Sequence, residues 1–429
     1  MKKWIIFPIL LLVGLVVTSA QAQTEAFFLG HITGVGGRAL SMGSAYLAVS
    51  DDYSATLWNP AGLTQLRRME LFASMSNLKY LNESTLGEVK NSDKTTKTKL
   101  NSIGFAFPVP TYRGSLVFAV GYNRVRNFDS GFSLGLYNSY YGVNQEFTEI
   151  EEGGLNNWVF AGAMEVTENL SIGASMNIWR GNDDYYLNFY EEDIDDAYYY
   201  DNYSYDQQIL TKYNAVNFKL GALYRFARFF RFAATVATPV SMNAEEDWEE
   251  LTSQVEDADS PDEDYLNDQS GSWDYGIKFP FVFSAGAAVT LLPNIVVSGD
   301  VEYTDWSQTR YTKEPPVGDR FSENLDFKQN YAATTTYRVG AEFTVPLINA
   351  QLRAGAIRIP SPLKDATSQQ DRNYYTVGGG LLLDKQVKID VAYIHGWWEK
   401  AESSLSEGLD PLNEKITFDT VFATLSVRF

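Results

Sequence analysis

Apolar and polar residues alternate along most of the chain from about residue 69 onward. In residues 336–345, Tyr337, Val339 and Phe343 fall on one face, and Arg338 and Glu342 fall on the other. Successive side chains leave opposite faces of a β-strand, so a period of two predicts strands. About fourteen segments fit, near 69–80, 100–108, 114–127, 155–165, 168–180, 213–225, 229–241, 278–291, 294–306, 335–345, 349–358, 373–383, 386–396 and 415–429.

The polar faces carry charges in the middle of strands, opposite faces that are almost purely apolar. Asp300, Glu302, Lys388 and Asp390 are examples. A soluble sandwich would alternate as well, with its polar face in solvent, but a lipid-facing exterior around a wet lumen explains both faces. The connections alternate short and long, and an even strand count lets the sheet close. We therefore expect an all-β transmembrane fold, a 14-stranded antiparallel outer-membrane β-barrel spanning residues 69–429.

The longest predicted connections are acidic and rich in tyrosine, and we expect them to be external loops at 181–212, 242–277, 306–334 and 397–414. Residues 243–272 contain twelve acids and no Lys or Arg. Such runs are usually solvated loops, and calcium bridging to surface lipopolysaccharide is the alternative. The aspartates between 257 and 264 lack the Gly and terminal Glu of a helix-loop-helix calcium site, so no metal ligands are assigned.

Both ends of the chain carry export signals. Lys2 and Lys3 precede an apolar run from residue 4 to residue 17, and Ala20-Gln21-Ala22 is a small-x-small cleavage site, which predicts a signal peptide over residues 1–22. The last predicted strand ends on Phe429, and a C-terminal aromatic residue resembles the signal read by the barrel assembly machinery. Outer-membrane lipid and lipopolysaccharide are therefore expected partners.

Composition narrows the chemistry. The chain has no cysteine, which removes disulfides, thiolate metal sites and a lipid-bearing cysteine. Its formal net charge of -20 leaves no basic stripe for nucleic acid. The two histidines, His31 and His395, lack an evident nucleophile partner, and no zinc spacing or phosphate-binding loop occurs. These observations predict neither enzymatic activity nor a cofactor.

Residues 23–68 do not alternate and are rich in Gly and Ala. Residues 39–49 are compatible with a short helix, and Asp51 or Asp52 could cap another that stops before Pro60. Small residues pack tightly in a confined space, and a barrel of about fourteen strands is wide enough to need a plug. We expect this segment to be a helical hatch inside the lumen.

The hatch segment resembles the plug of the outer-membrane long-chain fatty acid and aromatic hydrocarbon transporter family. The resemblance rests on a glycine-arginine run, an acidic pair and an Asn-Pro-Ala tripeptide. The matching residues are Gly37, Arg38, Met42, Gly43, Asp51, Asp52, Asn59, Pro60 and Ala61. In this family the tripeptide lies in the hatch close to an inward kink of the third strand, where the wall opens sideways.

The resemblance implies passive uptake of hydrophobic small molecules, fatty acids or hydrocarbons, with lateral release through the wall. In the predicted third strand Gly121 is the candidate kink, because glycine within a strand often marks a bend. The same pattern occurs in the barrel that serves type IX secretion as a shuttle, so a secretion protein that binds polypeptides is the alternative. A general porin is a third possibility. The sequence leaves the cargo open.

Overall fold

The computed structural model describes residues 31–32, 34–227, 229–256, 265–384, 386–400 and 410–429. Its strands form one antiparallel sheet that closes on itself, because the last strand pairs with the first long one from Arg428↔Glu70 to Leu412↔Leu86. The predicted fold class is confirmed. The described residues form nineteen strands, but β1 and β14 have only two residues each. Three pairs of the remaining strands are interrupted single strands, which leaves fourteen in the wall.

The wall strands follow the chain around the barrel, and each lies beside its sequence neighbour. They are β2 (Glu70–Leu86), β3 (Val89–Val109), β4 (Leu116–Asn127) with β5 (Ser130–Asn138), β6 (Val143–Glu165), β7 (Leu170–Asp193), β8 (Tyr200–Phe226), β9 (Phe230–Ala237) with β10 (Ser241–Glu256), β11 (Tyr265–Lys278) with β12 (Val282–Leu292), β13 (Ile295–Asp305), β15 (Ala333–Val345), β16 (Ala350–Ile359), β17 (Arg372–Leu383), β18 (Val387–Glu399) and β19 (Leu412–Arg428).

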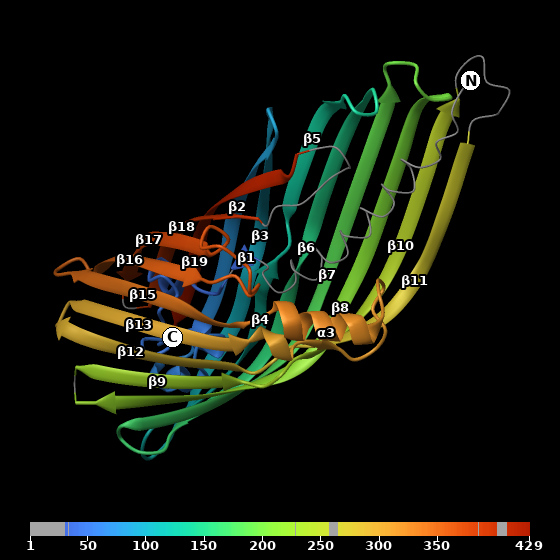
Figure 1. Cartoon of the computed structure of the whole chain (residues 1–429). Coiled ribbons are helices and arrows are strands. Elements are labelled where there is room, and N and C mark those ends of the chain that lie inside the picture. The colour runs from blue at the N-terminus through green and yellow to red at the C-terminus, as the bar shows by residue number, and fades with distance from the viewer. Residues whose placement is uncertain (1–30, 33, 228, 257–264, 385, 401–409) are drawn as a thin grey trace.

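The wall is tall on one side and low on the other. β6, β7, β8, β10 and β11 rise far above β13 to β18 (Figure 1). Two prolines, Pro239 and Pro280, interrupt neighbouring strands at the level where the tall side begins. Proline has no N–H for the strand ladder, so the pairing breaks there and the upper strands bend away. We call this upper part the tall end and the opposite part the short-turn end.

The prediction of external loops at 181–212 and 242–277 is wrong. β7 and β8 pair as far as Glu192↔Asn202, and β10 and β11 as far as Gln254↔Tyr265. Residues 181–212 and 242–256 are thus largely strand. In β7 an inward row of Tyr185, Leu187 and Phe189 is buried while the intervening residues are polar, so this part of the strand has its own apolar core inside a hydrated exterior. In 306–334 the chain instead forms η3 (Trp306–Gln308), β14 (Arg310–Tyr311) and α3 (Arg320–Asn330).

The outer face of the lower wall is apolar. On β15, Tyr337 and Val339 are more than half exposed, whereas Arg338 and Glu342 are buried on the lumen side. At the short-turn end, Phe105 stacks on the terminal Phe429, with ring centroids 6.4 Å apart. None of the described helices is long and apolar enough to cross a membrane.

Inside this wall lies a compact segment made of short helical turns. It comprises α2 (Gly37–Ser41), η1 (Tyr53–Thr56) and η2 (Pro60–Gln65), preceded by β1 (His31–Ile32). The helix is shorter than the one expected over 39–49, because Gly43 and Ser44 adopt positive φ and turn the chain. Asp52 caps η1 through Ser54 N, as expected for one of the two acids. Residues 34–66 are almost entirely buried, and we call them the hatch. The predicted signal peptide lies outside the described residues.

Candidate functional site: the hatch and the wall window

The Asn-Pro-Ala tripeptide lies against a pair of glycines in the wall. Gly173 on β7 and Gly221 on β8 are direct cross-strand partners. A Cβ on Gly173 would lie 2.5 Å from Ala61 N, and one on Gly221 would lie 2.2 Å from Asn59 Oδ1. The Asn59 amide donates to Leu47 O at 3.0 Å and to Ala222 O at 3.2 Å, while its oxygen accepts from Ala61 N. The tripeptide thus joins two hatch segments to the wall at β7 and β8.

A second glycine pair receives the other half of the predicted motif. Gly340 and Gly355 face each other across β15 and β16, and a Cβ on them would lie 2.1 Å from Met42 O and 2.2 Å from Gly43 N. Gly43 N also donates to Thr376 Oγ1 on β17. Because the hatch backbone itself touches the wall here, any side chain on either wall glycine would push the hatch away.

A third pair, Gly104 on β3 and Gly121 on β4, receives the ring of Tyr53. The Tyr53 hydroxyl lies 3.3 Å from Asn123 Oδ1. Gly121 itself is paired in register with Gly104 and Val159. Its missing side chain makes room for the tyrosine, and the hatch residue that touches the third wall strand here is Tyr53.

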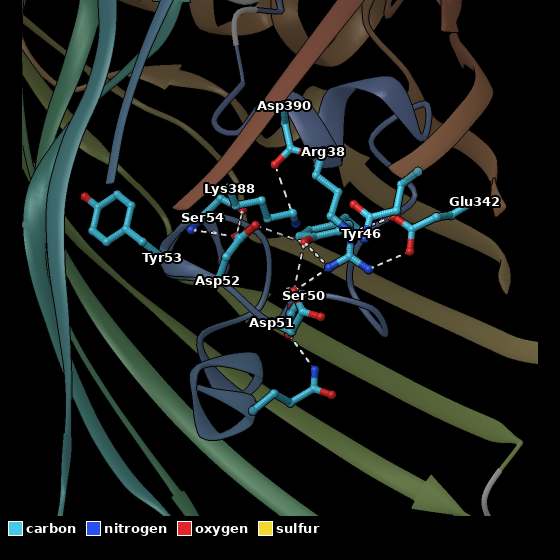
Figure 2. A network of polar contacts seen from close by, with 12 residues as sticks. Arg38, Tyr46, Ser50, Asp51, Asp52, Tyr53, Ser54, Glu342, Lys388 and Asp390 are labelled. Carbon is cyan, nitrogen blue, oxygen red and sulfur yellow. Dashed lines mark hydrogen bonds and ion pairs between the residues drawn. The ribbon is translucent and has the colours of Figure 1, made fainter. Parts of the chain in front are cut away.

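Arg38 is the centre of a buried ionic network (Figure 2). Its guanidinium makes a two-pronged contact with Glu342 on β15, with Nε and Nη2 each 2.8 Å from a carboxylate oxygen, and it also pairs with Asp51 of the hatch. Arg353 on β16 extends the network from Glu342 to Asp390 on β18, both at 2.6 Å. The hatch is therefore tied to three wall strands by charges that are shielded from water.

The charge of Asp51 depends on this network. Burial opposes its ionised form, but Arg38, Lys388 and Arg428 outweigh burial and lower the pKa of the carboxyl from 3.8 to about 2. Because the pKa of Asp51 is lower in the folded state, its ionised carboxylate stabilises the seated hatch. This stabilisation is complete above pH 3.8 and is lost as the pH falls towards 2.

The hatch also spans the junction at which the barrel closes. Gly37 N donates to Thr424 Oγ1 on β19 at 2.8 Å, and Tyr53 N donates to Glu70 Oε1 on β2 at 2.7 Å. Arg428 on β19 pairs with Glu70 across the junction and donates to Asp51 O at 3.1 Å. The first and last wall strands are thus both bonded to the hatch, β2 at Tyr53 and β19 at Gly37 and Asp51.

Pairing between β3 and β4 stops at Ser102↔Asn123. Immediately beyond this pair each strand contains one extra residue. On β3, Ser102 and Leu100 pair with consecutive residues of β2, so Asn101 is the extra residue. On β4, Arg124 and Arg126 pair with consecutive residues of β6, so Val125 is the extra residue. Such β-bulges bend a strand and re-aim its side chains, so the two strands diverge at the same level.

We call the stretch in which β3 does not pair with β4 or β5, residues 94–101 on one side and 124–132 on the other, the wall window. Within the described chain no backbone pairing joins β3 to β5, and only side chains cross the gap. Lys99 lies 3.4 Å from Asp129, and above the window Ser133 N donates to Asp93. The outward side chain of Leu100 is 53% exposed, so the window opens at the upper border of the apolar band. β1 pairs with β4 at Arg126 and Asn127, on the edge that β3 has left.

Substituting Gly173 by Ala tests the glycine seat. The added methyl would meet hatch backbone, which cannot rotate away as a side chain can. We therefore expect the seated position of the hatch to be destabilised by about 1–3 kcal/mol relative to an unseated one. The measurement is the rate at which a water-soluble maleimide labels a single cysteine placed at Ser50, since the chain has no other cysteine. Gly299→Ala is the matched control, because its nearest atom is 3.7 Å away. Equal labelling in the two variants would contradict a seat at Gly173.

Sequence reasoning identified the hatch motif but missed several residues that hold it. Tyr53, Arg353 and the wall glycines other than Gly121 carried no local signal, because their partners lie far away in the chain, and Gly121 was expected to bend its strand and not to receive Tyr53. Within the described residues no group of three or more carboxylate or imidazole side chains could hold a metal ion.

Comparison with known proteins agrees with this architecture. A family model described as "Outer membrane protein transport protein (OMPP1/FadL/TodX)" matches residues 15–427. The crystal structure of the P. putida toluene transporter TodX has a TM-score of 0.68 and 12% identity, covering 93% of this chain and 99% of that chain. A Pseudomonas aeruginosa FadL homologue has a TM-score of 0.59 at 12% identity, again covering 93% and 99%.

The Ralstonia pickettii toluene transporter TbuX has a TM-score of 0.57 at 13% identity, with coverage of 93% and 99%. At these identities the structural matches show the shared fold. No curated protein sequence matches the chain. The family model, which covers nearly the whole length, shows that the chain belongs to the OMPP1/FadL/TodX family of outer-membrane transport proteins, which are channels and not enzymes.

Proposed function

We propose that this protein takes up hydrophobic small molecules passively and releases them sideways into the membrane through the wall window. The observation that carries the proposal is the pair of bulges at Asn101 and Val125, which interrupts the wall beside a lumen closed by the hatch. Transfer of a hydrophobic molecule into the aqueous periplasm is unfavourable, whereas lateral release into the membrane keeps its apolar surface out of water.

A cluster of buried apolar side chains beside the wall window supports this proposal. Phe128, which directly follows β4, belongs to a cluster of buried apolar side chains from β6, β8, β10, β11 and α3. Tyr213 lies edge-on to Phe128 at 6.2 Å, and Phe327 of α3 packs on Tyr311 at 5.8 Å. A hydrophobic ligand entering from the tall end would meet this cluster next to the window. Toluene transporters with the same fold are consistent with such cargo.

Uptake of labelled oleate and toluene by intact cells tests the proposal. Cells that express the chain are expected to accumulate at least one of the two compounds faster than cells without it. Asn59→Leu, which removes the hydrogen bonds to Leu47 and Ala222, is expected to slow this uptake, because the hatch could not return to its seat. Leu has the same number and branching of side-chain heavy atoms as Asn, but its two methyl groups cannot form hydrogen bonds.

The rival function is a barrel that binds secreted polypeptides, as in type IX secretion. The acidic exterior of the tall end is the feature that would serve it. Unchanged uptake of both compounds in the Asn59→Leu variant, together with loss of secreted protein, would favour this rival and reject the transport proposal.

A further inference from the structure

Two neighbouring turns at the short-turn end expose large aliphatic side chains. Leu291 and Leu292 end β12 directly before its turn to β13, and Leu347 and Ile348 lie in the turn between β15 and β16. All of them are more than half exposed, and Leu347 is fully exposed. Because β13 pairs with β15, the two turns lie side by side and project together (Figure 1). We call these residues the apolar rim.

The backbone at Leu347 is strained as well as exposed. Leu347 follows Pro346 and has a φ of 79°. Proline followed by a positive φ is the pattern of a type II turn, in which glycine or asparagine normally takes the second position because other side chains are strained there. In water this leucine would combine backbone strain with a fully hydrated apolar side chain. An apolar environment around the turn would offset both effects.

The apolar rim is continuous with the outer surface of the lower wall. Val345 and Ala350 form the last outward pair of the β15–β16 hairpin, and Phe343 pairs with Leu352 before them. Residues 291–294 and 346–349 contain no charged side chain. The rim therefore extends a surface whose partner is lipid, and lipid is the partner that its chemistry fits.

The turn on the other side of the barrel has a different character. β3 and β4 are the second and third of the wall strands, whereas β13 and β15 are the ninth and tenth of fourteen, so the β3–β4 turn lies directly across the lumen from the apolar rim. Its tip, Tyr112, is also fully exposed, but it is flanked by Thr111 and by the exposed Arg113. The charge of Arg113 favours water or headgroups over acyl chains.

We propose that the apolar rim lies in the headgroup–acyl boundary of the periplasmic leaflet while the β3–β4 turn stays in water, so that the barrel is tilted in the membrane. This boundary takes up the aliphatic side chains and still offers hydrogen-bond partners to the turn backbone. A tilt in this sense lowers β3 and β4 relative to β13 and β15. The wall window, at the upper border of the apolar band, thereby moves into lipid. Only this last consequence rests on the proposed transport function.

Fluorescence quenching in lipid bilayers tests the tilt, because a chain without cysteine accepts single labels. Bimane is attached at Leu347→Cys or, as the matched control, at Tyr112→Cys, the fully exposed tip of the opposite turn. The Leu347→Cys label is expected to show blue-shifted emission and to be quenched by a phospholipid with a nitroxide near its headgroup. The Tyr112→Cys label is expected to be quenched by iodide present on both sides of the bilayer.

Two outcomes of this experiment would overturn the tilt. Equal quenching of both labels by iodide would mean that the apolar rim is in water, where it would be free to bind a periplasmic protein. Equal quenching of both labels by the nitroxide lipid would mean an upright barrel. Neither outcome depends on transport.

A charge on the apolar rim tests the consequence for the wall window. Leu347→Asp should draw its turn into water and reduce the tilt. Thr98 is exposed on the outer face of the window, so bimane at Thr98→Cys should change from lipid quenching to iodide quenching when Leu347→Asp is added. Tyr112→Asp, which places the same charge on the polar turn, should leave the label unchanged. Iodide quenching of the Thr98→Cys label without Leu347→Asp would overturn the placement of the window in lipid.

Uptake of labelled oleate or toluene separates this inference from the proposed function. Leu347→Asp is expected to lower uptake, with heat-modifiable migration on a gel as the check that the barrel has folded. If the Thr98→Cys label moves into water while uptake stays normal, the tilt is upheld and release through the window is rejected.

Discussion

Deletion of Val125 is expected to reduce the uptake of a hydrophobic ligand to the level of cells without the protein. Val125 is the extra residue of the β4 bulge, so its removal would let Arg124 and Arg126 follow one another in register with β6. A straight β4 could continue its ladder with β3 beyond Ser102↔Asn123 and close the wall window. The measurement is uptake of labelled oleate or toluene, with heat-modifiable migration on a gel as the check on barrel folding.

Deletion of Asp201 is the matched control for this experiment. It is also the extra residue of a bulge, opposite Val255 and Glu256, but it lies at the top of β8 far from the window. Uptake should survive this deletion. If the Val125 deletion folds and still transports the ligand at the normal rate, release does not pass through the window.

Replacing Arg38 by Ala is expected to unseat the hatch and open the lumen to ions. The change removes the only hatch side chain that contacts Glu342 in the described structure and leaves Asp51 without its closest cation. Removing one partner of a buried ion pair costs roughly 3–5 kcal/mol. We expect the lower end of this range, because Arg353 still pairs with Glu342. The measurement is ionic conductance in a planar bilayer, which should rise from nearly none to that of an open barrel.

Arg358→Ala provides the comparison for Arg38→Ala. Arg358 also pairs with a carboxylate, Asp371 at 2.7 Å, but its side chain is 57% exposed. Arg358 is exposed and donates to Asp371 and not to the hatch, so conductance should stay low. Arg38→Lys should give an intermediate result, because lysine keeps the charge but loses the two-pronged geometry. A closed channel in Arg38→Ala would show that the glycine seats alone hold the hatch.

The alternation of apolar and polar residues predicted the barrel because strand periodicity is a local property. It also predicted a polar lumen, but it did not predict that lumen side chains bind the hatch. Asp300 accepts from Leu47 N at 2.9 Å, and Glu342 accepts from Arg38, so these buried lumen charges bind the hatch instead of facing water. Their partners lie about 250 to 300 positions away in the chain, and no local pattern connects them.

Two features escaped the sequence for physical reasons. The prediction of loops at 181–212 and 242–277 rested on the premise that strands end at the membrane surface. Rows of buried aromatic side chains, such as Tyr203 and Tyr205, instead allow the sheet to continue beyond the membrane with an apolar core of its own. The bulges at Asn101 and Val125 escaped because one additional residue in a strand leaves no mark in composition. Only the register of the neighbouring strands reveals it.

The contacts of the hatch with both β2 and β19 have a consequence for biogenesis. Thr424 and Glu70, on either side of the junction, both accept hydrogen bonds from hatch backbone, and Arg428 donates to Glu70 and to Asp51 O of the hatch. Pairing of β2 with β19 and seating of the hatch therefore stabilise each other. We expect a newly inserted molecule to complete its last strand pairing and its seal together, which would spare the cell an unplugged pore during assembly.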